Sequence, residues 1–151
     1  MKKIMILVAL SLIAGSASAY DKGMASSYEQ YFAPFVGKET TTALQLIKPN
    51  DFVNAIKKGD KMFVLDIRTP GETAIVGLTI SSSVAIPMDQ VFKPASLTRI
   101  PTDRYVVVVC QGGVRAMAIA TALRHTGFSN IYVLKGGARD LVKYLNQKTA
   151  Y

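Results

Sequence analysis

The feature that most constrains the fold of this chain is a run of four valines that leads into its one cysteine. Residues 105–115 read YVVVVCQGGVR. Consecutive valines favour a strand that is covered on both faces, as in a parallel sheet. The alanine-rich segment 115–126 has a helical pattern, with Ile119 and Leu123 on one face and Gly127 as the terminating residue. The order strand, glycine loop, helix therefore predicts a unit of a parallel α/β sheet.

The loop between this strand and helix favours an ionised thiol at Cys110. Gly112 and Gly113 permit a tight turn whose N–H groups point inward. The N-terminus of the next helix and the cation of Arg115 add positive potential at the same place. The alternative is a buried, inert thiol that acts as a small hydrophobic residue. The glycines and the arginine behind the cysteine favour a reactive nucleophile.

The first 19 residues have the pattern of a secretory signal peptide. A short basic head, residues 1–3, precedes an apolar run at 4–14 and the small-residue sequence Ala17-Ser18-Ala19. The apolar run is shorter than the roughly 20 residues that span a bilayer. We expect cleavage near Tyr20, a periplasmic product and no stable membrane anchor after cleavage. An uncleaved N-terminal anchor is the alternative. The single cysteine of an exported chain cannot form an internal disulfide.

The charge of the chain argues for small anionic partners. The formal net charge is +8, of which Lys2 and Lys3 in the signal segment contribute two units. The other basic residues are scattered, so the sequence lacks the basic stripe typical of nucleic-acid binding. Attraction of small anions is one interpretation and a merely solvated basic surface is the other. No residue cluster has metal-ligand spacing, and no cofactor is expected.

The remaining chain divides into an N-terminal extension, residues 20–46, and a domain, residues 47–151. The extension contains several aromatic residues and a short predicted helix at 25–33 that ends before Pro34. We expect it to pack against the domain. It could also serve partner binding or a homodimer, and the residues leave these roles open.

The domain alternates between predicted helices and strands. We expect helices at 49–58, 115–126 and 138–147, strands at 62–66, 84–86, 105–109 and 131–134, a loop at 70–77, and short helical turns between 88 and 101. This order predicts an α/β fold with a mostly parallel central sheet flanked by helices on both faces. Ligands of such sheets bind beyond the carboxyl ends of the strands, which is where Cys110 lies.

Three segments of the domain resemble the rhodanese family of sulfurtransferases. Residues 110–115 are similar to the family's Cys-x-x-Gly-x-Arg loop. Asp66-Ile67-Arg68 with Glu72 is similar to its Asp-x-Arg-x-x-x-Glu signature, and residues 133–137 to its late strand and glycine pair. The resemblance covers approximately residues 47–145 and implies a rhodanese-like, single-domain protein of the exported type.

The resemblance implies a set of site residues. Cys110 would be the catalytic residue and would carry a persulfide. The substrate-binding residues would be the rest of the loop, namely Gln111, Gly112, Gly113, Val114 and Arg115. Asp66 and Arg68 would brace the sheet edge, with a second anion contact by Arg68 as the alternative. The implied partners are an anionic sulfur donor, thiosulfate or polysulfide, and an acceptor that is cyanide, a thiol or a protein cysteine.

Two other functions share the same loop. Dual-specificity phosphatases have one residue more between cysteine and arginine, and the smaller loop here fits sulfur better than a tetrahedral phosphate. A non-catalytic persulfide or polysulfide carrier, or an interaction module delivering sulfur to a periplasmic partner, would differ from an enzyme only in turnover. His125, the sole histidine, lies near a helix end where a cation suits the dipole, and we expect no catalytic role for it.

Overall fold

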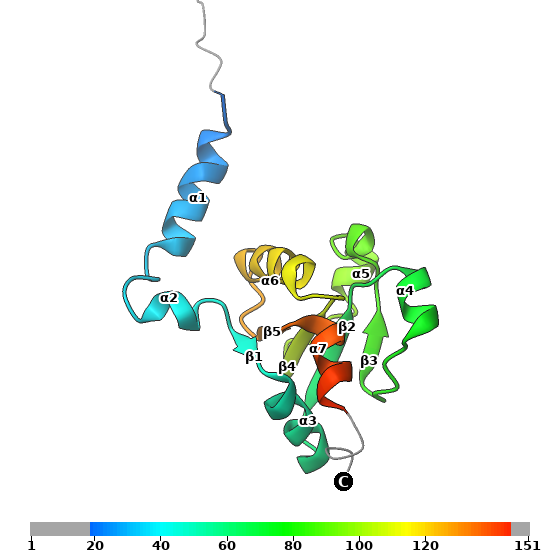
Figure 1. Cartoon of the computed structure of the whole chain (residues 1–151). Coiled ribbons are helices and arrows are strands. Elements are labelled where there is room, and N and C mark those ends of the chain that lie inside the picture. Colours follow the sequence, from blue (N-terminus) through cyan, green and yellow to red (C-terminus); the bar gives the residue numbers. More distant parts are fainter. Residues whose placement is uncertain (1–18, 146–151) are drawn as a thin grey trace, which may run out of the picture.

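The core of the fold is a five-stranded sheet in which every pair of neighbouring strands is parallel. The computed structural model describes residues 19–145. The strand order is β1-β5-β4-β2-β3 (Figure 1). The strands are β1 (Leu46–Ile47), β2 (Met62–Asp66), β3 (Ser83–Ala85), β4 (Tyr105–Val109) and β5 (Ile131–Leu134). The predicted α/β fold class is confirmed.

Helices cover both faces of the sheet. The helical segments are α1 (Lys22–Phe32), α2 (Glu39–Thr42), α3 (Pro49–Lys58), α4 (Pro70–Ile75), the 3₁₀ turn η1 (Met88–Gln90), α5 (Pro94–Leu97), α6 (Val114–His125) and α7 (Gly137–Tyr144). The valines of β4 alternate between two apolar clusters. Val106 and Val108 pack in a cluster with α6, whereas Val107 and Val109 pack in a cluster with α3 and α7. Burial of both faces explains why this strand is apolar throughout.

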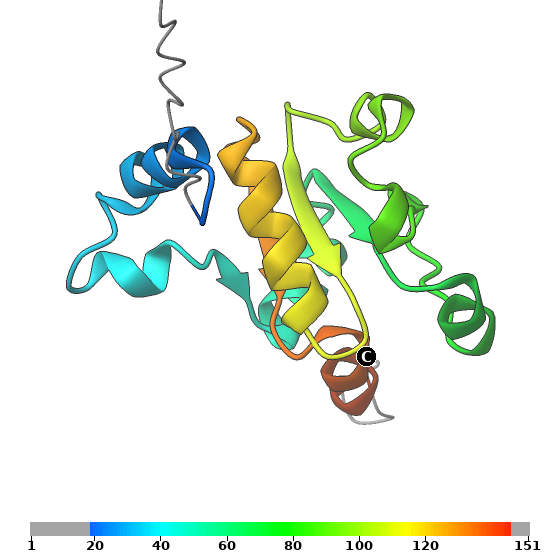
Figure 2. The ribbon, with the colours of Figure 1, turned by 90° about the horizontal axis from the view of Figure 1, so that it is seen from above.

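The ends of the long domain helices follow from local sequence. Pro49 occupies the first turn of α3, and Gly59 ends it with φ 75°. Helix α6 ends at His125 with Thr126 as its C-cap, and Gly127 follows with φ 109°. The N–H of Phe128 then donates to the carbonyl of Leu123 at 3.2 Å. Helix α6 therefore runs from the cysteine loop to the N-terminal extension (Figure 2).

Several predicted elements need correction. Residues 70–75, expected as loop, form α4, because Thr69 and Glu72 make a reciprocal capping box at its start. Strand β1 and helix α2 were not predicted. Strand β1 spans residues 46 and 47, between which we expected the boundary of extension and domain. The short helical turns expected between residues 88 and 101 are η1 and α5, and Pro94 begins α5. Helix α7 starts one residue earlier than predicted and ends at Tyr144.

The N-terminal extension contacts the domain at the C-terminal end of α6 (Figures 1 and 2). The Oγ of Ser27 lies 2.8 Å from Nε2 of His125, and the ring of Tyr28 stacks on that imidazole with centroids 4.0 Å apart. No helix within residues 19–145 is long and apolar enough to cross a membrane. The signal-peptide prediction falls almost entirely on residues 1–18, which lie outside the described residues.

Candidate active site

Cys110 lies directly after β4, at the carboxyl edge of the sheet, and its side chain is held by backbone amides. The N–H of Gly113 donates to Sγ at 3.1 Å, and the N–H of Ala116 donates to it at 3.4 Å. The residue is 1% exposed and belongs to the apolar cluster beneath α6. The sulfur therefore accepts two backbone amides, one from the loop and one from the first turn of α6.

The orientation of the loop is fixed by α7. The N–H groups of Ala138 and Arg139 donate to the carbonyls of Cys110 and Gln111 at 2.8 and 3.0 Å. Since C=O and N–H point in opposite directions across a trans peptide, these bonds turn the next two N–H groups of the loop away from α7. Gly137, at φ 63°, makes this close approach possible, because a Cβ there would overlap the carbonyl oxygen of Cys110.

Arg115 is held by Glu72 from helix α4. Its Nη1 donates to Oε2 of Glu72 at 2.9 Å, and its Nη2 donates to Oε1 at 2.5 Å. The hydrogen bonds from Arg115, followed by the backbone N–H of Thr69, lower the pKa of Glu72 to about 2. The pKa of Arg115 is raised, chiefly by Glu72 and to a smaller extent by the neighbouring Cys110. The guanidinium is thus a permanent cation beside the sulfur, fixed between α6 and α4.

Asp66 and Arg68 form a buried ion pair at the carboxyl end of β2. They are 3% and 1% exposed. The Nε of Arg68 donates to Oδ1 of Asp66 at 2.9 Å, and its Nη2 donates to Oδ2 at 2.6 Å. The pair links two side chains at the edge of the sheet, and the bracing role implied by the resemblance stays a prediction. The Nη1 of Arg68, however, is buried and has no hydrogen-bond partner among the described residues.

A cationic pocket of about 290 Å³ adjoins the cysteine loop. Its charged and polar lining residues are Arg68, Gln111, Arg139 and Lys143. The guanidinium of Arg139 lies 3.9 Å from the position of a Cβ built on Gly112, so it sits against the loop. The side chain of Arg68 is fully buried behind this pocket, and its alternative role as a second anion contact stays a prediction.

The predicted loop residues lie in different environments. Of the predicted substrate-binding residues, Gly113 donates its backbone N–H to the sulfur. Gln111 and Val114 are exposed to solvent, and Val114 is 82% exposed. Sequence reasoning omitted Ala116, the second donor to Sγ, and Arg139. It also left Glu72 out of the site, although the quoted Asp-x-Arg-x-x-x-Glu signature contains it. Within residues 19–145, no three His, Cys, Asp or Glu side chains cluster as metal ligands.

Comparison with known proteins identifies the family of the domain. Residues 48–143 match the family model described as the rhodanese-like domain. A sulfurtransferase of Allochromatium vinosum is 33% identical over 78 residues, which are 52% of this chain and 69% of that protein. The probable adenylyltransferase/sulfurtransferase MoeZ of Mycobacterium tuberculosis is 31% identical over 112 residues, or 73% of this chain. That match spans only 28% of the mycobacterial protein.

The solved structures agree as well. A rhodanese-like domain protein of Staphylococcus aureus superimposes with a TM-score of 0.56 at 26% identity, covering 64% of this chain and 90% of that one. A parallel sheet with a cysteine loop at its carboxyl edge and an arginine beside the sulfur defines the class of the protein as an α/β domain built around a cysteine loop. The chain belongs to the rhodanese-like domain family.

Proposed function

We propose that this protein is an exported sulfurtransferase that moves sulfane sulfur from an anionic donor, thiosulfate or polysulfide, to a thiophilic acceptor through a persulfide on Cys110. The observation that carries the proposal is the placement of Sγ. It accepts hydrogen bonds from the amides of Gly113 and Ala116 and lies beside the cation of Arg115. These groups favour a thiolate, the form of cysteine that acts as a nucleophile.

In the first step the Cys110 thiolate attacks the outer sulfur of the donor. A new S–S bond forms on Cys110 while the donor's own bond to that sulfur breaks. With thiosulfate, the electron pair of the broken bond leaves on sulfite, and the enzyme keeps a negatively charged persulfide. With polysulfide, a chain shorter by one sulfur departs. The loop amides and Arg115 stabilise the negative charge that remains on the terminal sulfur.

The cationic pocket supports an anionic donor. Arg68 and Arg139 line it next to Gln111, and Nη1 of Arg68 has no protein acceptor among the described residues. The side chain of Arg68 is fully buried, so its charge would act on a bound anion through the pocket wall and not by a direct hydrogen bond. The side chain of Arg139 is exposed and would meet the donor at the entrance of the pocket. The net positive charge of the chain would also attract an anionic donor.

In the second step a nucleophilic acceptor attacks the terminal sulfur of the persulfide. Cyanide, a thiol or the cysteine of a partner protein forms a bond to this sulfur, and the S–S bond breaks. The electron pair returns to Cys110 as thiolate, so the cycle needs no redox cofactor. For an exported protein the acceptor would be a periplasmic molecule or protein.

The test is steady-state formation of thiocyanate from thiosulfate and cyanide by the purified protein. The wild type is expected to turn over many times, and Cys110→Ser to lose transfer completely. Thermal unfolding of both proteins checks that the substitution leaves the fold intact. Undiminished transfer by Cys110→Ser would refute the assignment.

The same assay separates an enzyme from a sulfur carrier. A carrier would load one sulfur per Cys110 from polysulfide and release it only to its partner, without steady-state turnover with cyanide. Hydrolysis of an aryl phosphate by the wild type, lost in Cys110→Ser, would instead assign a phosphatase. We expect neither outcome.

A further inference from the structure

An apolar groove of about 310 Å³ adjoins the cysteine loop on the side of the edge strand β1 (Figure 1). Its walls come from β1, the cysteine loop, the start of α6 and the end of β5. The lining residues are Leu46, Gly112, Gly113, Val114, Met117, Val133, Leu134, Lys135 and Gly136. The cationic pocket next to Gln111 shares none of these residues. The loop that holds Cys110 therefore borders two different surfaces, one cationic and one apolar.

The groove exposes large apolar side chains next to the reactive loop. Val114 is 82% exposed at the first position of α6, and Leu46 is 40% exposed in β1. Met117 packs against the cluster beneath α6 and is only partly buried. Exposed apolar side chains gathered around a groove are typical of protein–protein contacts. Because thiosulfate, polysulfide and cyanide are small anions, this apolar surface suits a larger molecule.

The groove also touches the sulfur site itself. Gly113 is one of its walls, and the N–H of the same residue donates to Sγ of Cys110 at 3.1 Å. A Cβ built on Gly113 would lie 3.3 Å from the backbone nitrogen of Gly136, so the loop packs directly on the chain after β5. A segment bound in the groove would therefore lie against the residue that bonds the sulfur.

Two lysines lie side by side at the rim of the groove. Ile47 and Leu134 are partners in the register of β1 and β5, so Lys48 and Lys135, which follow them, leave the sheet next to each other. Both lysines are exposed, and neither forms an ion pair within residues 19–145. No acidic residue of this part of the chain lines the groove. The rim is therefore complementary to an acidic partner.

Helix stability does not account for these lysines. Lys48 is the N-cap of α3 and makes no capping bond with its side chain. Lys135 lies one residue before Gly136, the N-cap of α7. The dipole of a helix disfavours a cation at its N-terminus, so neither position favours lysine for local reasons. Both charges are available to an acidic group outside the domain.

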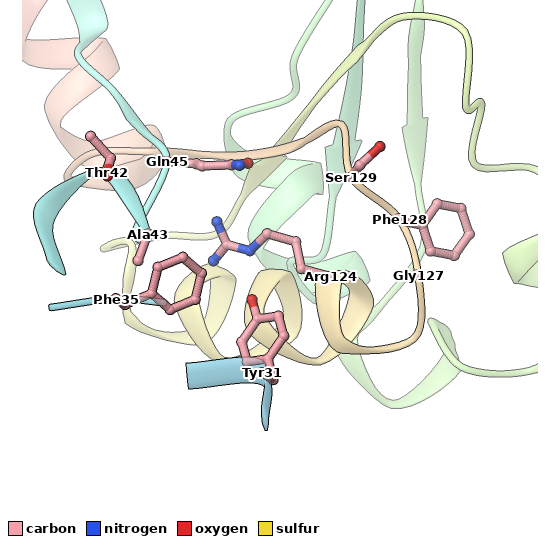
Figure 3. Close-up of a pocket in the computed structure, with 9 residues that line it drawn as sticks. All are labelled: Tyr31, Phe35, Thr42, Ala43, Gln45, Arg124, Gly127, Phe128 and Ser129. Atoms are coloured by element: carbon pink, nitrogen blue, oxygen red, sulfur yellow. The ribbon is translucent and has the colours of Figure 1, made fainter. Parts of the chain in front are cut away.

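The pocket at the opposite end of α6 differs from this groove in both respects (Figure 3). Its one cationic lining residue is Arg124, whose Nε and Nη1 are shielded from solvent. Figure 3 shows the rings of Tyr31 and Phe35 beside that guanidinium. Arg115 and Arg124 are nine positions apart on α6, which corresponds to roughly 14 Å along the helix axis. A partner at that end would be remote from the thiol.

We propose that the groove beside β1 receives the segment of a partner protein that carries the acceptor cysteine. An apolar side chain next to that cysteine lies in the groove, and an acidic side chain pairs with Lys48 and Lys135. The inference rests on the proposed function, because it assigns the acceptor of the sulfur carried by Cys110.

The transfer to such a partner is balanced without a further reagent. The partner's thiolate forms a bond to the terminal sulfur of the persulfide, and the bond between that sulfur and Cys110 breaks. The electron pair of the broken bond returns to Cys110 as thiolate. The partner leaves with the persulfide and its negative charge.

The probes are three peptides that each contain one cysteine. They are acetyl-Glu-Leu-Cys-Leu-Glu-amide, its charge-reversed form acetyl-Lys-Leu-Cys-Leu-Lys-amide, and acetyl-Glu-Ser-Cys-Ser-Glu-amide, which lacks the apolar side chains. The protein is loaded from thiosulfate, freed of excess donor and mixed with each peptide. Mass spectrometry then follows the gain of one sulfur by the peptide. The first peptide is expected to react at least about tenfold faster than either of the others.

The intrinsic reactivity of the peptides is measured separately, by their reaction with polysulfide in the absence of protein. Neighbouring carboxylates disfavour a thiolate, whereas neighbouring ammonium groups favour it. The lysine peptide should therefore be the more reactive one in solution. A preference of the protein for the glutamate peptide would then reflect recognition and not thiol chemistry.

Variants test which residues carry the preference. Lys48→Glu and Lys135→Glu are each expected to reduce the ratio of the glutamate rate to the lysine rate at least about threefold. Leu46→Ser should reduce the advantage of the leucine peptide over the serine peptide. Arg104→Glu makes the same charge change at an exposed residue before β4, at the opposite edge of the sheet, and should leave both ratios unchanged. Ratios within one variant cancel general changes in rate, and thermal unfolding checks each fold.

The failure of this inference is distinguishable from failure of the proposed function. A wild type that forms thiocyanate but transfers sulfur to the peptides in their intrinsic order would overturn the inference alone. A wild type that neither loads sulfur nor forms thiocyanate would refute both. Phenylmethanethiol reacting as fast as the glutamate peptide would assign the groove to a small apolar thiol. A dimer in solution that is lost in Leu46→Ser would assign it to a second copy of the chain. Either assignment would overturn the proposal.

Discussion

The two ends of α6 differ in how their arginines are satisfied. At the N-terminal end, Arg115 is bound by both carboxylate oxygens of Glu72, and the sulfur of Cys110 receives two backbone amides. At the C-terminal end, Nε and Nη1 of Arg124 are shielded from solvent and have no acceptor within residues 19–145. The first end is organised around a negative charge that the protein itself supplies. The second end lacks such a charge within residues 19–145, and its guanidinium is covered by the neighbouring chain instead.

The largest effect expected from this comparison concerns Arg115. Arg115→Ala removes the cation beside the sulfur and the ion pair with Glu72. The rate of sulfur transfer should fall about 10²–10³-fold, because the loss of one charge-stabilising donor in an active site has an effect of this size. The control is Arg104→Ala, whose guanidinium pairs only with its neighbour Asp103 in an exposed position. Thiocyanate formation measures both. A wild-type rate in Arg115→Ala would show that the amides alone stabilise the sulfur.

The next effect concerns the support of the loop by Gly137. A Cβ there would overlap the carbonyl oxygen of Cys110 and lie 2.8 Å from that of Gln111. Gly137→Ala should therefore lower the free energy of unfolding by about 2–4 kcal/mol through overpacking and left-handed strain, and reduce transfer as well.

A matched control exists for this substitution. Gly59 also has positive φ, 75°, but a Cβ there meets nothing within 4 Å. Gly59→Ala should cost only the backbone strain, about 1–2 kcal/mol, and leave transfer intact. Urea unfolding compares the two variants. Equal losses would mean that the contact between α7 and the loop is unimportant.

A smaller effect is the pH dependence contributed by Glu72. Hydrogen bonds from Arg115, then Thr69, lower its pKa from 4.5 to about 2 in the folded protein. The stabilisation is therefore fully present above about pH 4.5 and is lost as the pH falls toward 2. Glu72→Gln should lose stability less steeply across this window and be about 1 kcal/mol less stable at neutral pH. Thermal unfolding against pH provides the measurement, and parallel curves would contradict the prediction.

The smallest effect concerns the other end of α6. Tyr28→Ala removes the ring that stacks on His125 and should weaken the attachment of α1 by about 1 kcal/mol. Hydrogen exchange of the α1 amides should become faster. Tyr20→Ala, at a residue that is 64% exposed, is the control and should change little. Unchanged exchange in Tyr28→Ala would mean that other contacts hold the extension.

The chemistry at the N-terminal end of α6 was predictable because it is local in sequence. Cys110, Gly113 and Arg115 lie within six residues, and a valine strand and an alanine-rich helix bracket them. The long strands were predictable for the same reason, since each is a short apolar run between turns. Residues 69–75 were misinterpreted because Pro70-Gly71 suggested a turn, although the Thr69 and Glu72 spacing signals a capped helix.

Features that depend on packing were not predictable. Glu72 and Arg115 are 43 positions apart, so their bond exists only in the folded sheet. Arg139 reaches the loop because α7 packs its first turn against it. The extension lies on the end of α6 through Ser27 and Tyr28, and no periodic pattern in residues 20–46 indicates this contact. The two-residue strand β1 is too short to leave a sequence signal.

The most direct test of this account is the mass of the intact protein after exposure to thiosulfate, and separately to polysulfide. The account predicts a gain of one sulfur atom, located on Cys110, removed by cyanide and absent in Cys110→Ser. A thiol that keeps its mass with both donors, in folded protein at neutral pH, would contradict it.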